Sequence, residues 1–106
     1  MNKAEEKVIN FNKLAGKVYI GRPDGALARK YFKLDEVDRE HSYPVKVIFP
    51  ADAKTITSSF FLGMFGKSVL SAGTKEQFMK NFVFDANPRI LNEVEIGIFE
   101  ALSSRC

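Results

Sequence analysis

The stretch TITSSFFLGMFGKSVLSAG, residues 55–73, places the strongest constraint on how this chain folds. It predicts a helix over 58–72, because apolar residues stand at positions 60, 61, 62, 64, 65, 69 and 70. In the first two turns these positions cover almost the whole circumference, so the segment 60–65 must be buried on most sides. Gly73 is suited to end the helix, since glycine tolerates the backbone angles found just past a helix C-terminus.

Predicted strands and helices alternate along the rest of the chain. Strands are expected over 6–11, 17–21, 45–49 and 82–85, and helices over 22–37, 74–81 and 87–105. The first two strands lie a short turn apart, which predicts a β-hairpin. The order β-β-α-β-α-(α)-β-α predicts a single-domain α/β fold over residues 1–106, with one mixed β-sheet of about four to five strands flanked by helices.

Capping residues predict where the helices begin. Asp24 is the expected N-cap of the first helix, in which Leu27, Tyr31 and Leu34 are spaced to share one buried face. Either Thr57 or Ser58 is expected to cap the helix at 58. Thr74, with Gln77 three residues later, and Asn87, with Pro88 after it, predict the starts of the last two helices.

Charge and cysteine content narrow the function classes. The net charge is +3, but the lysines and arginines are scattered, which favours a solvated surface over a nucleic-acid interface. A single cysteine, Cys106, allows no disulfide within the chain. The stretch MNKAEEK lacks the apolar core of a signal peptide, and the apolar run 60–65 is too short to span a membrane. A cytoplasmic protein is expected.

No set of catalytic residues emerges from the sequence. The one histidine, His41, lies in a polar turn, and neither a nucleophile elbow nor a phosphate-binding loop is present. One histidine and one cysteine cannot form a zinc cluster. Glu93 and Glu95 are expected on the solvent face of the last helix. We therefore expect a protein that is not an enzyme and carries no cofactor or metal.

Two clusters are candidates for binding. Thr57, Ser58 and Ser59 stand at a helix N-terminus, where unpaired N–H groups and the helix dipole favour a hydroxyl or an anion. Capping alone would explain one of these hydroxyls, and the others form a surface that could bind phosphate or be phosphorylated. Arg22, Asp24, Gly25 and Arg29 form the second cluster. Its plainer interpretation is a strand–helix turn with two solvated arginines.

The segment VKVIFPADAKTITSSFFLGMFGKSVL (45–70), with GRPDGALAR before it and FVFDANPRILNEVEIGIFEAL after it, resembles the STAS-like domain family of unknown function. That family is a relative of the STAS domains of anti-sigma factor antagonists. The resemblance covers roughly residues 8 to 105, and ITSSFFLGMFG is its most specific part. It implies a mixed sheet flanked by helices and a role in binding rather than catalysis.

The resemblance also implies a partner and a modification site. In anti-sigma factor antagonists a serine at the start of the second helix is phosphorylated by a histidine-kinase-like ATPase, which switches the partnership off. Ser58 matches that serine, while Thr57 stands where an aspartate usually precedes it. The predicted function is a small regulatory module that docks a protein partner near Ser58. The alternative is a nucleotide- or nucleic-acid-binding domain that uses the same helix N-terminus, with Arg22 and Arg29 for phosphate.

Overall fold

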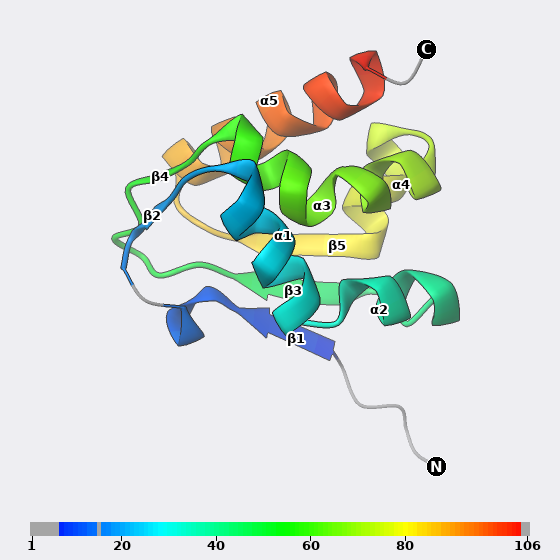
Figure 1. Ribbon diagram of the computed structural model, residues 1–106, viewed down its shortest axis with the longest axis horizontal. Helices are drawn as coiled ribbons and strands as arrows, with labels where there is room; N and C mark the ends of the chain where they lie inside the picture. The colour runs from blue at the N-terminus through cyan, green and yellow to red at the C-terminus, as the bar shows by residue number, and fades with distance from the viewer. Residues whose placement is uncertain (1–6, 15, 105–106) are drawn as a thin grey trace.

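The computed structural model of the protein describes residues 7–14 and 16–104 (Figure 1), so Cys106 lies outside it. Its elements in chain order are β1 (Lys7–Asn10), η1 (Phe11–Lys13), β2 (Val18–Tyr19), α1 (Arg22–Tyr31), α2 (Leu34–Glu40), β3 (Val45–Ile48), β4 (Thr55–Ile56), α3 (Ser58–Ala72), α4 (Lys75–Asn81), β5 (Phe82–Asp85) and α5 (Pro88–Ser103). Within these ranges, no helix has the length and apolar character needed to cross a membrane.

The strands form two small parallel sheets. One has the order β1-β3-β5, with Ile9 opposite Val47 and Val47 opposite Phe84. The other pairs β2 with β4, Tyr19 lying opposite Ile56. The α/β class is confirmed, whereas the single mixed sheet is wrong. The hairpin is also wrong, because η1 leads the chain out of the first sheet before β2 begins, and both early strands find partners beyond the first helices.

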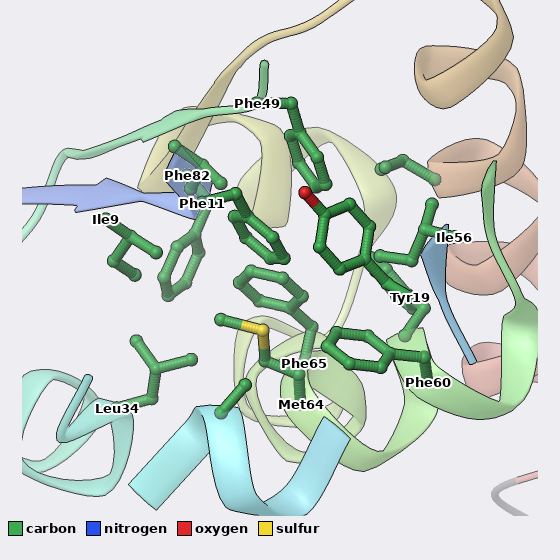
Figure 2. Close-up of a cluster of buried hydrophobic side chains, with 14 of the residues drawn as sticks. Ile9, Phe11, Tyr19, Leu34, Phe49, Ile56, Phe60, Met64, Phe65 and Phe82 are labelled. Atoms are coloured by element: carbon green, nitrogen blue, oxygen red, sulfur yellow. The ribbon is translucent and has the colours of Figure 1, made fainter. Parts of the chain in front are cut away.

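Phenylalanine rings fill the core between the three-stranded sheet and α3. Phe11 and Phe49 are stacked with ring centroids 4.0 Å apart, and Phe65 packs edge-on against Phe82 at 5.6 Å. Figure 2 shows these rings beside Tyr19 and Met64. In α3 the side chains of Phe60, Phe61, Met64 and Phe65 are all buried. The expectation that the segment 60–65 lies in a buried helix is confirmed.

Side-chain caps fix the starts of three helices. The hydroxyl of Thr57 accepts a hydrogen bond from the Phe60 N–H at 3.2 Å and caps α3. Thr74 accepts one from Gln77 and caps α4. Asn87 accepts one from Ile90 and caps α5, with Pro88 in the first position. Gly73, with φ of 88°, ends α3 as expected.

The predicted helix 22–37 is divided in two. Lys33 adopts a left-handed conformation, with φ of 59°, and separates α1 from α2. The first helix starts at Arg22, so Asp24 lies in its first turn instead of capping it, and Gly21 is the N-cap. Of the predicted buried face, Leu34 is buried, but Leu27 is 64% exposed and Tyr31 59% exposed. The residues of α1 that face inward are Gly25, Ala28 and Arg29.

The backbones of α1 and α3 are in direct contact, which explains this choice of face. A Cβ atom added to Gly25 would lie 2.1 Å from the Phe60 carbonyl oxygen, and one added to Gly63 would lie 2.3 Å from that of Arg22. Real Cβ atoms do not approach backbone this closely, so only glycine fits at either position. A face that carried Leu27 would hold the two helices apart.

We expect Gly63→Ala to lower the free energy of unfolding by at least about 2 kcal/mol, since the new methyl group would have to separate two packed helices. Gly66, one turn further along α3, provides the control. Its added Cβ would meet only the Leu62 side chain, at an ordinary 3.8 Å. Gly66→Ala should therefore leave stability unchanged or raise it by up to about 1 kcal/mol through helix propensity. Urea unfolding checks both, and equal losses would refute the backbone contact.

Candidate functional site

The two clusters predicted from separate parts of the sequence lie together in the structure. Because β2 and β4 are parallel and each leads into a helix, α1 and α3 begin side by side (Figure 1). The Gly21 N–H donates to the Thr57 hydroxyl at 3.3 Å, and the Thr57 N–H donates to the Tyr19 carbonyl at 2.9 Å. Two helix N-termini, with their partial positive charges, therefore meet at one place on the surface.

The hydroxyl side chains at this place have different roles. Thr57 caps α3 and also holds Gly21, so it is structural. Thr55 donates to the Glu93 carboxylate, which also accepts from the Ile56 N–H at 2.9 Å. Glu93, expected to be solvated, instead ties α5 to β4. Ser58 is half-buried and Ser59 exposed, and neither side chain hydrogen-bonds to any residue that the structure describes.

The second cluster is split between surface and interior. Arg22 and Asp24 are exposed in the first turn of α1, where the carboxylate of Asp24 is favoured by the helix dipole. Gly25 is an ordinary helical residue whose role is the contact with Phe60, whereas Gly21, just before α1, has a positive φ of 93°.

Arg29 is buried, at 7% exposure, which contradicts its interpretation as a solvated arginine. Its guanidinium donates to Asp35 at 2.7 Å, to Asp38 at 3.0 Å and to the Met64 carbonyl at 2.8 Å. It also donates to the Ser68 hydroxyl, which in turn donates to Asp38 at 2.6 Å. The network joins α1, α2 and α3. We conclude that the charge of Arg29 is satisfied inside the protein.

Tyr43 completes this network from the loop before β3, where its hydroxyl donates to Asp38. Burial raises the pKa of the Tyr43 phenol far above its usual value, and the hydrogen bond to the Asp38 carboxylate raises it further. At the other end, the hydrogen bond and charge of Arg29 lower the pKa of Asp35. Sequence reasoning missed Ser68, although it lies on the same helical stripe as the buried Phe61 and Phe65.

An exposed apolar groove opens at the paired N-termini. It has a volume of about 310 Å³, and its lining includes Phe60 and Asp24, from the first turns of α3 and α1. Its other walls expose large apolar side chains of β2, of the connection after it and of α1, namely Val18, Ile20, Leu27 and Tyr31. The sequence did reveal the stripe of Leu27 and Tyr31, but that stripe was assigned to the core.

No chemistry-bearing cluster accompanies the groove. Across residues 7–14 and 16–104, no group of three or more His, Cys, Asp or Glu side chains is placed to hold a metal ion. Comparison of the chain with protein-family models, curated proteins and solved structures gives no match. The arrangement combines an apolar groove with two serine hydroxyls, which suits recognition of another molecule by contact.

Replacing Arg29 tests the buried network. Arg29→Met should lower the free energy of unfolding by about 3 kcal/mol or more, because Asp38, only 12% exposed, would keep a buried charge without a cation. Asp35→Asn is the control: it removes another partner of the same guanidinium, but this carboxylate is 70% exposed and should matter by less than about 1 kcal/mol. Chemical denaturation of both variants measures the difference. If both variants lost a similar amount of free energy of unfolding, Asp38 would not be the buried charge on which the network depends.

Proposed function

We propose that this protein is a small regulatory module that docks a protein partner where α1 and α3 begin. The docking surface consists of Ser58 and Ser59 together with the apolar groove walls Val18, Ile20, Leu27 and Tyr31. The observation that carries the proposal is the exposed apolar groove, whose lining includes Phe60 from the same first turn of α3 as Ser58 and Ser59. The hydroxyls of these two serines hydrogen-bond to no described residue. Contiguous apolar side chains on a surface are typical of protein interaction sites.

The charges at the groove favour a protein over a nucleotide or nucleic acid. The phosphate-binding alternative needs both Arg22 and Arg29, but Arg29 is buried against Asp35 and Asp38. The carboxylate of Asp24 lines the groove and would repel a phosphate. An apolar side chain of a partner meets no such penalty, and its burial is favourable.

Phosphorylation of Ser58 or Ser59 is part of the proposal. A phosphate in the first turn of α3 would be stabilised by the helix dipole and would leave the fold intact. It would also place about two negative charges on the docking surface, and a partner shaped for neutral hydroxyls would then bind less well. A histidine-kinase-like ATPase is the partner class we propose, on the resemblance to the STAS-like family.

Site-specific photo-crosslinking in the native cell tests the docking surface. A photoreactive amino acid at Leu27 should give a discrete protein adduct, since this side chain projects from the groove wall. The same group at Phe99 provides a matched control, because that side chain is 71% exposed but lies on α5, outside the groove. Adducts from both positions alike, or from Phe99 alone, would place the interaction elsewhere.

A pair of substitutions at Ser58 then tests the role of the hydroxyl. Ser58→Asp should weaken binding of the crosslinked partner by tenfold or more, because the interface would have to bury an unpaired charge. Ser58→Ala should bind nearly as well as the unmodified protein. Both should melt close to wild type, since Thr57 is the cap and a carboxylate in the first turn is favoured. If both variants bound the partner with equal affinity, Ser58 would lie outside the interface.

A further inference from the structure

A second groove lies on the other flank of α1. The helices α1 and α3 meet at their glycines, where Gly25 lies against Phe60 and Gly63 against Arg22. Further along, Arg29 of α1 reaches Met64 and Ser68 of α3, and α3 is also packed against α5. The outer face of α3 forms the floor of a groove of about 550 Å³, with α1 and α5 as its walls. Gly63 and Gly66 keep this floor low.

The size of this groove matches a short helical segment. Its α1 wall extends from Arg22 to Lys30, and its floor extends from Leu62 to Leu70. Each span covers nine residues, and the eight steps between its ends correspond to about 12 Å of helix, or roughly two turns. Leu62, Leu70 and Ala101 supply apolar contacts along the groove, and Leu70 is substantially exposed. An amphipathic helix could bury its apolar face there.

The rim of the groove carries more positive than negative charge. Arg22, Lys30 and Lys67 line it and form no ion pair with any residue in the described part of the chain. The acidic residue of the lining, Asp35, is bonded to Arg29. Arg29 neutralises one of the two carboxylates that it contacts, Asp35 and Asp38, so one negative charge remains. The three cations of the rim outnumber it. Carboxylates of a ligand would complement this rim.

We infer that this groove binds an acidic amphipathic helix of a protein partner. Apolar side chains of that helix would lie over Gly66, and its carboxylates would pair with Lys30 on the α1 wall and with Lys67 on α3. The inference does not rest on the proposed function, because the two sites use different flanks of α1. A negative result at one site does not affect the other, since Leu27 and Ser58 do not line this groove.

A display library of random 16-residue peptides, selected on the purified protein, tests the inference. Enriched peptides should be net acidic, with apolar residues spaced three and four apart. A synthetic peptide from the selection should bind the double variant Lys30→Glu/Lys67→Glu at least about tenfold more weakly than wild type, as measured by fluorescence anisotropy. Lys13→Glu/Lys80→Glu is the control, with the same change in net charge at two exposed lysines outside the groove. It should bind as wild type does.

Several results would overturn the inference. Selection of neutral or basic peptides, no enrichment at all, or equal weakening by both double variants would each do so. Vesicles containing phosphatidylserine provide the competing probe. If they bind the protein through Lys30 and Lys67 while acidic peptides do not, the groove belongs to a membrane-facing surface instead. Melting temperatures within a few degrees of wild type would establish that both double variants are folded.

Discussion

The contact between the backbones of α1 and α3 determines the arrangement of most of the molecule. Gly25 and Gly63 let each helix rest on the carbonyl groups of the other, which no larger residue would allow. Because the parallel strands β2 and β4 each lead into one of these helices, the two N-termini meet. Arg29 then reaches across to the Met64 carbonyl and to Ser68. One close approach thus creates both the paired N-termini and the two flanking grooves.

Features that depend on local chemistry could be predicted from the sequence. The apolar circumference of 60–65 predicted a buried helix, and Thr57, Thr74 and Asn87 predicted helix starts. These predictions were correct because each of the three caps and this buried segment is decided within a few residues. Strand pairing is decided by partners far along the chain. The hairpin was therefore predicted from proximity in sequence, although β1 and β2 pair with β3 and β4.

The candidate site shows the same division. Its location at a helix N-terminus was predicted, but the assignment of Leu27 and Tyr31 to the core was wrong. Hydrophobicity favours burial of such residues, but α1 and α3 lie so close together that these large side chains do not fit between them. The burial of Arg29 could not be predicted either, since its acceptors come from α2 and α3. A charged side chain is buried only where several such partners converge, and convergence is a property of the fold.

The parallel pairing has a consequence for how the chain folds. Lys7 pairs with Val45, Val18 with Thr55 and Val45 with Phe82, so each strand finds its partner 37 or 38 positions further along. No sheet can start from a local turn, and each pairing must close a long loop before it gains any ladder hydrogen bonds. Helices can form early, while both sheets depend on distant segments meeting. On a ribosome the three-stranded sheet cannot close until β5 has emerged, so most of the protein is synthesised before its core can assemble.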